Sequence, residues 1–226
     1  MEFDSFVLAA ATADLGDEPA ARRHADAVEF RMDLAADPLA ALETYDGELP
    51  VLATNRAAWE GGEADADEVD RLAALERAAE HPQVEAVDVE LAALREPTGV
   101  EAAAAVRDEG AAVVASVHDF EATPSEGEMT DLLREAADRG DVGKLAVTAH
   151  DRGETLALLS ATHDATERGD RVATMAMGEA GRHTRALAPV YGSKIGYAPV
   201  DPADATAPGQ YDLATLADLV ERLGGG

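Results

Sequence analysis

The chain has 226 residues, no cysteine and a formal net charge of −28. The lack of cysteine excludes disulfides and Cys-ligated zinc or iron–sulfur sites. A chain this acidic would be repelled by phosphate backbones, and its carboxylates are spread over every helical segment rather than clustered as in a DNA mimic, so we expect no nucleic-acid partner. No apolar stretch approaches the roughly 20 residues that a membrane helix needs. The N-terminus also lacks the basic region of a signal peptide, and together these features predict a cytoplasmic protein with no membrane partner.

The acidic composition has a second feature, a scarcity of lysine. Asp and Glu total 46 against 18 basic residues, of which only Lys144 and Lys194 are lysine. An acidic, Lys-poor, Ala-rich chain is typical of proteins adapted to molar salt, where the Debye length of about 3 Å screens self-repulsion. The sequence therefore predicts a fold that fails at low salt.

Short apolar runs alternate with Ala/Glu/Arg/Leu segments of helical period along the whole chain. In chain order, the pattern predicts strands over 6–12, 27–32, 50–55, 84–91, 111–117, 142–148, 171–177 and 191–197. Helical segments are expected near 17–26, 37–45, 65–80, 98–109, 126–138, 152–167, 180–188 and 212–223. Eight strands alternating with eight helices predict an α/β protein with a single (β/α)8 barrel, formed by residues 1–226 as one domain. A doubly wound open sheet is the alternative, although it usually has fewer strands at this length.

Charged side chains interrupt two of the predicted strands. Glu29, Arg31 and Asp33 share one face of their strand at a spacing of two residues, and Asp88 and Glu90 share a face of another. Strands of a parallel barrel are covered on both faces, so these charges need partners or a task. Either a structural ion-pair network or a site in the barrel mouth accounts for them, and the sequence leaves the roles of Asp33, Asp88 and Glu90 open.

His118 and Lys144 are the sharpest candidates for chemistry. His118 ends a predicted strand, and in a barrel the carboxyl end of a strand is where catalytic groups lie. Lys144 is one of two lysines and sits inside an apolar strand. An amine can lose its proton and attack a carbonyl, which a guanidinium cannot do, whereas the alternative is an inward lysine paired with Glu29 or Glu90. Lys194 and His150 are weaker competitors, and since no histidine spacing fits a metal, we expect neither metal nor cofactor.

Seven short motifs now point to one family. EFRMD, NRAAWEGGE, DVEL, SVHDF, GKLAV, MAMGEAGRHTR and APGQ, between Glu29 and Gln210, resemble in order and spacing the type I 3-dehydroquinate dehydratases. The acidic, Lys-poor version is similar to a haloarchaeal member. This resemblance implies a hydro-lyase of the shikimate pathway that converts 3-dehydroquinate to 3-dehydroshikimate and water, and it implies a homodimer.

The resemblance also implies roles for individual residues. Lys144 matches the lysine that forms a Schiff base with the C3 ketone, and His118 matches the general acid/base. Glu60 matches the carboxylate that orients this histidine, and Arg185 matches the guanidinium that binds the substrate carboxylate.

The remaining matches are substrate-binding positions. Glu29, Arg31 and Arg56 match residues that bind the ring hydroxyls and order the charge network, and Met175 and Tyr197 would wall the ring. In the loop after the last strand, Thr206 and Gln210 match residues that close over the substrate. Tyr197 and Thr206 depart conservatively from the Phe and Ser of the family pattern.

Two other functions remain as alternatives. A Schiff-base aldolase on the same barrel would use the same lysine but would usually need a glycine-rich phosphate loop, which the sequence lacks. A non-catalytic binding barrel would be expected to have lost one of Lys144, His118 and Glu60.

Overall fold

In the computed structural model, residues 1–201, 203 and 209–224 are described, and they form a sheet of eight parallel strands. The strand order is β7-β6-β5-β4-β3-β2-β1-β8, so each strand lies beside the next one in the chain and β8 returns to β1. The strands are β1 (Val7–Thr12), β2 (Ala27–Arg31), β3 (Val51–Thr54), β4 (Val84–Glu90), β5 (Ala112–Asp119), β6 (Val142–Thr148), β7 (Val172–Met177) and β8 (Ile195–Pro199).

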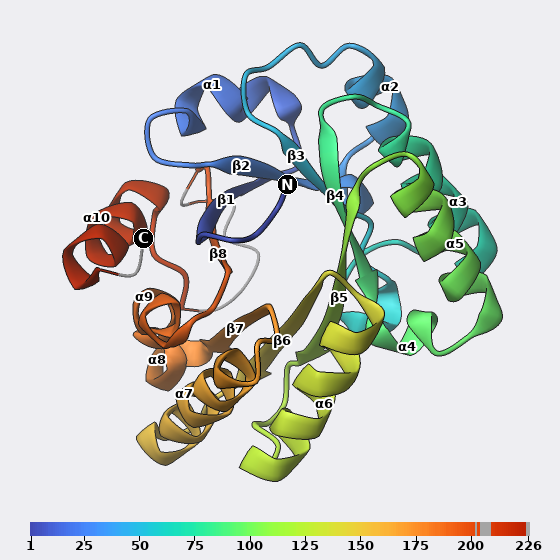
Figure 1. Ribbon diagram of the computed structural model, residues 1–226. Helices are drawn as coiled ribbons and strands as arrows, with labels where there is room; N and C mark the ends of the chain where they lie inside the picture. Colours follow the sequence, from blue (N-terminus) through green and yellow to red (C-terminus); the bar gives the residue numbers. More distant parts are fainter. Residues whose placement is uncertain (202, 204–208, 225–226) are drawn as a thin grey trace.

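Helices connect the strands and surround them on the outside (Figure 1). They are α1 (Glu18–Ala21), α2 (Pro38–Glu43), α3 (Glu68–Ala79), α4 (Leu91–Leu94), α5 (Pro97–Asp108), α6 (Glu126–Arg139), α7 (Arg152–Glu167), α8 (Gly178–Gly181), α9 (Thr184–Leu187) and α10 (Leu213–Leu223), with short 3-10 turns η1 (Leu15–Asp17), η2 (Met32–Leu34), η3 (Ala58–Glu60) and η4 (Ala188–Tyr191). Acidic residues begin many of the helices, because a side chain such as that of Asp67, Asp151 or Asp212 accepts hydrogen bonds from backbone N–H groups of the first turn.

The barrel is nearly closed where the first and last parts of the sheet meet. The backbone N–H of Lys194 donates to the carbonyl of Val172 at 2.7 Å, and that of Thr174 donates to Oγ of Ser193 at 3.0 Å. These bonds join β7 to the residues just before β8. The (β/α)8 barrel predicted from the sequence is confirmed, and the open doubly wound sheet is excluded.

Two predicted boundaries near the C-terminus are wrong. The last strand was expected over 191–197 but runs over Ile195–Pro199, because the preceding residues form η4 and Gly192 ends that turn at φ +101°. A Cβ at Gly192 would lie 2.2 Å from Oγ1 of Thr166, so only glycine fits this turn. The helix expected over 180–188 is split into α8 and α9. Likewise, only Glu18–Ala21 is α-helical in the segment expected over 17–26.

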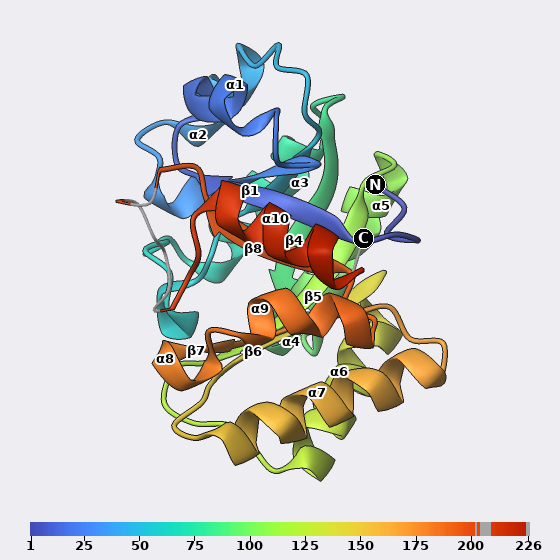
Figure 2. The same ribbon diagram turned by 90° about the vertical axis from the view of Figure 1, so that its left-hand side faces the viewer.

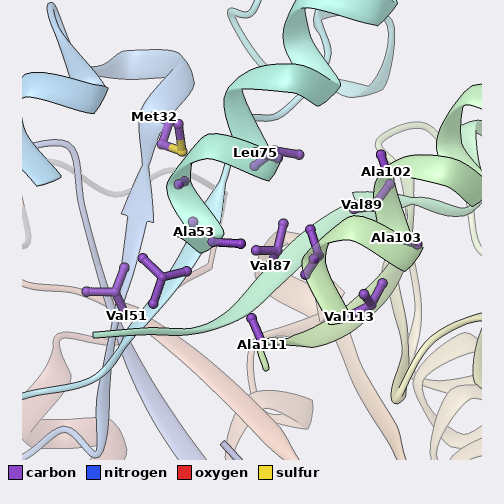
Figure 3. Packing of buried hydrophobic residues seen from close by; sticks show 14 of the residues in the cluster. Met32, Val51, Ala53, Leu75, Val87, Val89, Ala102, Ala103, Ala111 and Val113 are labelled. Atoms are coloured by element: carbon purple, nitrogen blue, oxygen red, sulfur yellow. The ribbon is translucent and has the colours of Figure 1, made fainter. Parts of the chain in front are cut away.

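Alternate residues of each strand face either the helices or the barrel interior. Figure 3 shows part of the outer layer, in which Val87 and Val113 of the sheet pack near Leu75 of α3 and Ala102 of α5. On another side of the barrel, α10 lies against β1 and β8 (Figure 2). Phe30 packs in the outer layer, as expected from its position between Glu29 and Arg31, so those two charged residues face inward.

Apolar side chains fill the amino end of the barrel. Phe3, which is 3% exposed, packs there with Leu52, Val142 and Ile195. The N-terminal segment thus covers this opening, and the polar inward residues lie toward the carboxyl ends of the strands.

Candidate active site

A pocket opens at the carboxyl ends of the strands and encloses about 540 Å³, including solvent at its mouth. Ten of the eleven site residues predicted from the sequence line it: Glu29, Arg31, Arg56, Glu60, His118, Lys144, Met175, Arg185, Tyr197 and Gln210. The eleventh, Thr206, lies outside the described residues. The structure therefore brings these side chains together, while their individual roles stay predictions.

Lys144 of β6 lines this pocket and is 3% exposed. Its Nζ donates to Oδ2 of Asp88 at 2.9 Å and lies 3.9 Å from Oε1 of Glu29. It also lies 4.2 Å from the ring centroid of Tyr197, which is a cation–π contact. The amine is thus held by a carboxylate and an aromatic face, and the partner expected from the sequence was partly wrong, since Glu90 does not pair with it.

His118 lies on β5, beside Lys144's strand, and its orientation is fixed by Glu60. Nδ1 lies 2.8 Å from Oε1 of Glu60, and the backbone N–H of His118 donates to the same oxygen at 3.1 Å. Because this oxygen already accepts one N–H, the arrangement favours the tautomer with a proton on Nδ1, which leaves Nε2 free to accept a proton. Phe120 stacks on the imidazole, with centroids 6.1 Å apart.

Burial and nearby charges shift the pKa values of both His118 and Glu60. Burial, with the positive charges of Arg56 and Lys144, holds the pKa of His118 well below its usual range. Burial raises the pKa of Glu60 to about 8, against the opposing effect of Arg56. A histidine that stays neutral in this way has the protonation state of a general base.

Arg56, just after β3, is the hub of the buried charges. It donates to Oδ1 of Asp88 at 2.8 Å, to Oε1 of Glu90 at 3.1 Å and to Oγ of Ser116 at 2.7 Å. Burial alone would raise the pKa of Asp88, but the positive charges of Arg56 and Lys144 hold this pKa below its usual range. Asp88 is therefore an anion that joins Arg56 to Lys144.

Glu90 and Asp33 occupy the edge of this network. Glu90 accepts from the backbone N–H of Ala57 at 3.0 Å and forms an ion pair with Arg71 of α3 at 2.7 Å. Asp33 binds Arg31 through two bonds, at 2.8 and 2.6 Å. Neither carboxylate lines the pocket. Both therefore hold arginines and loop backbone in place, which is the structural network that the sequence left open.

Arg185, on α9, differs from the other arginines in the pocket. It is 4% exposed, its Nε has no hydrogen-bond partner, and no carboxylate pairs with it among residues 1–201, 203 and 209–224. Burial lowers its pKa to about 10, so it remains charged at neutral pH. A buried, unpaired guanidinium at a pocket is suited to bind an anion.

Sequence reasoning missed several residues that line the pocket, and its two weaker candidates, His150 and Lys194, do not line it. Thr54, whose hydroxyl donates to Glu29 at 3.1 Å, and Phe120 both line it. Phe120 lies two residues after His118, a spacing that could have indicated it. His150 is exposed and bonds to the carbonyl of Glu121, and Lys194 bonds to the carbonyl of Asp4 near the amino end of the barrel.

Neither a metal cluster nor a membrane helix is found in the parts of the chain that the structure describes. No group of three or more His, Asp or Glu side chains there is arranged to hold a metal ion. No helix there is both long and apolar enough to cross a bilayer.

Comparison with known proteins identifies the family. The sequence profile of the type I 3-dehydroquinases matches residues 8–225. The chain belongs to the type I 3-dehydroquinase family. The 3-dehydroquinate dehydratase of Haloarcula marismortui is 60% identical, with 99% of this chain and 98% of the relative covered. That of Halobacterium salinarum is 58% identical over 99% of this chain and all of the relative. The resemblance inferred from the motifs is thereby confirmed, as is the hydro-lyase class of the enzyme.

A solved structure supports the same assignment. The 3-dehydroquinate dehydratase of Geobacillus kaustophilus superposes with a TM-score of 0.87 at 25% identity, covering 98% of this chain and 92% of its own. The acidic, Lys-poor composition, which predicts adaptation to high salt, fits the similarity of this chain to haloarchaeal 3-dehydroquinate dehydratases.

Proposed function

We propose that this type I 3-dehydroquinase dehydrates 3-dehydroquinate through a Schiff base on Lys144. The main support is that one pocket holds a buried lysine, a histidine whose Nδ1 is held by Glu60, and a buried Arg185 that pairs with no carboxylate of the described residues. These are the three groups that a β-hydroxy ketone carrying a carboxylate needs: a nucleophile for the ketone, a base for the adjacent proton and a cation for the carboxylate.

The reaction begins when the neutral amine of Lys144 attacks the C3 carbonyl and the adduct loses water to give an iminium. Asp88, 2.9 Å from Nζ, supplies the negative charge that this cation needs in a buried site. The face of Tyr197 contributes further stabilisation, since an aromatic face attracts a cation whether it is an ammonium or an iminium.

The iminium makes the C2 proton acidic by accepting its electron pair. Nε2 of His118 removes this proton and an enamine forms, while Glu60 binds the proton on Nδ1 and stabilises the charged imidazolium. The enamine then expels the C1 hydroxyl, which leaves as water with the proton from His118. Hydrolysis of the conjugated iminium consumes the water lost in the first step, so the net products are 3-dehydroshikimate and one water.

Arg185 orients the substrate for both proton transfers. Its guanidinium forms a charge-assisted pair with the C1 carboxylate, and this fixes C1 and C2 relative to His118. Arg31, Arg56 and Glu29 also line the pocket. In this proposal they bind the ring hydroxyls and hold the charge network. Met175 packs against the ring, and Gln210, which precedes α10, lines the same pocket.

An absorbance assay tests this function. Protein is mixed with 3-dehydroquinate in molar KCl, and the ultraviolet absorbance of the conjugated enone is followed for the wild type, Lys144→Ala and Lys194→Ala. We expect enone with the wild type and with Lys194→Ala, the matched control, and none with Lys144→Ala. A folded wild type that forms no enone refutes the proposed reaction and favours a Schiff-base aldolase, whose substrates would then be tested.

We also propose that the chain works as one barrel domain in a cytoplasmic homodimer, as its resemblance to the family implies. Sedimentation equilibrium in molar KCl tests the oligomeric state, and a mass equal to that of one chain would refute the dimer.

A further inference from the structure

Tyr197 of β8 carries a polar atom that the reaction described above does not use. The residue is 4% exposed and lines the pocket, yet its hydroxyl is buried and has no hydrogen-bond partner among the residues that the structure describes. A hydroxyl enclosed in this way has lost water without gaining a protein partner, which opposes folding. A phenylalanine would fill the same space without this cost, so the hydroxyl needs an explanation.

The aromatic ring alone does not supply one. Nζ of Lys144 lies 4.2 Å from the ring centroid, and this cation–π contact depends on the ring rather than on the hydroxyl. Nor does the hydroxyl bind the nearby carboxylates, since it has no hydrogen-bond partner among the residues that the structure describes. Burial, with Glu29 and Asp88 close by, raises the pKa of Tyr197 well above its usual value. It therefore keeps its proton and is a hydrogen-bond donor at any working pH.

The position of the ring limits which substrate group can reach it. In the Schiff base, C3 of the substrate is bonded to Nζ of Lys144, and Nζ lies over the ring of Tyr197. C3 therefore lies close to Tyr197. Two ring carbons, C2 and C4, flank that carbon. His118 stands on β5, which pairs with β6 on one side of Lys144, whereas Tyr197 stands on β8, beyond β7 on the other side. If C2 faces His118, as proton removal requires, C4 faces toward Tyr197.

From this geometry we propose that the Tyr197 hydroxyl donates a hydrogen bond to the C4 hydroxyl of the substrate, and so acts as a specificity-determining group. The proposal rests on the proposed function, because it takes the orientation of the ring from the Schiff base and from His118. The unpaired donor of the free enzyme gains its partner only when the substrate binds.

The test is Tyr197→Phe, which removes the hydroxyl and keeps the ring. Because the bond is present in both the ground state and the transition state, we expect KM to rise about tenfold with kcat within about twofold. The free enzyme should become more stable, with a thermal midpoint about 2–4 °C higher, because the buried unpaired hydroxyl is gone.

Tyr45→Phe is the matched control. The Tyr45 hydroxyl donates to the carbonyl of Leu49 at 2.7 Å, outside the pocket. Its removal should lower the thermal midpoint and leave KM and kcat unchanged. A Tyr197→Phe variant with unchanged KM, or with a midpoint lowered as in Tyr45→Phe, would overturn the proposal.

A substrate analogue with hydrogen in place of the C4 hydroxyl identifies the group that is bound. The wild type and Tyr197→Phe should turn over this analogue with equal KM, whereas an analogue lacking the C5 hydroxyl should keep the tenfold ratio. A ratio that persists without the C4 hydroxyl refutes the assignment. A wild type inactive on 3-dehydroquinate itself refutes the proposed function and this inference with it, whereas an active wild type with an unaffected variant refutes the inference alone.

Discussion

Replacing Arg185 by methionine should make the free enzyme more stable and far less active. The pKa of this guanidinium is lowered by burial from 12.5 to about 10, which corresponds to about 3 kcal/mol at 1.36 kcal/mol per unit. Because the folded state binds this proton less tightly than the unfolded chain does, the cost is present in full below pH 10. It disappears only as the pH rises through 10 toward the unfolded value.

Arg185→Met removes this cost and keeps most of the apolar volume of the side chain. We expect a free energy of unfolding higher by up to about 3 kcal/mol, and a thermal midpoint higher by up to roughly 6–12 °C for a chain of this length. The loss of a buried partner for the substrate carboxylate should lower kcat/KM about 10²- to 10³-fold. Circular dichroism melting and the enone assay, both in molar KCl at pH 7.5, measure the two effects.

Arg139→Met serves as the control, since Arg139 of α6 is paired and lies outside the pocket. It donates to the carbonyl of Leu94 at 2.8 Å and to Glu135 at 3.1 Å, so its loss should lower stability and leave kcat/KM unchanged. If Arg185→Met melts below the wild type, or if its kcat/KM falls less than tenfold, Arg185 is not an unpaired cation waiting for the substrate carboxylate.

Three further perturbations address the rest of the site. The pKa of Glu60 is about 8, and its ionised form keeps the proton on Nδ1 of His118, so kcat/KM should rise with pH through about 8. Glu60→Gln should remove this rise, and a wild-type profile that is flat from pH 6 to 9 would contradict the role of Glu60. Asp88→Asn leaves Arg56 and Lys144 without their shared anion, so urea unfolding at pH 7 should show a free energy of unfolding lower by about 3–5 kcal/mol. A decrease below about 1 kcal/mol would show that the anion is dispensable. The net charge of −28 makes the folded chain repel itself, and this repulsion weakens as the Debye length falls from about 10 Å in 0.1 M KCl to below about 3 Å in 2 M KCl. The thermal midpoint should therefore rise with KCl, and a midpoint independent of KCl would refute salt adaptation.

Much of the barrel could be predicted from the sequence because its signals are local. Alternating apolar runs and acidic helix starts predicted most elements, and α7 was predicted with its observed ends, Arg152–Glu167. The region between β7 and β8 was predicted poorly because tertiary packing decides it. Gly192 is required there by its contact with Thr166, which is distant in the sequence. No periodicity carries such information.

The site was predicted to the extent that single residues stand out in their strands. Lys144 and His118 were identified by residue type and strand position, but the partner of Lys144 was not. Asp88 and Glu90 share one face of β4, and the sequence cannot show which of them lies within reach of Nζ. Arg71, from the distant helix α3, engages Glu90 and leaves Asp88 to bind the amine. Such pairings depend on the three-dimensional order of the strands and helices.

Borohydride trapping tests the central claim most directly. The chain has only two lysines, so mass spectrometry of the protein treated with 3-dehydroquinate and sodium borohydride can assign a reduced adduct without ambiguity. We predict loss of activity and an added mass on the peptide that contains Lys144, with the peptide of Lys194 unchanged. Full activity after this treatment, or an adduct on Lys194 alone, would contradict Schiff-base catalysis by Lys144.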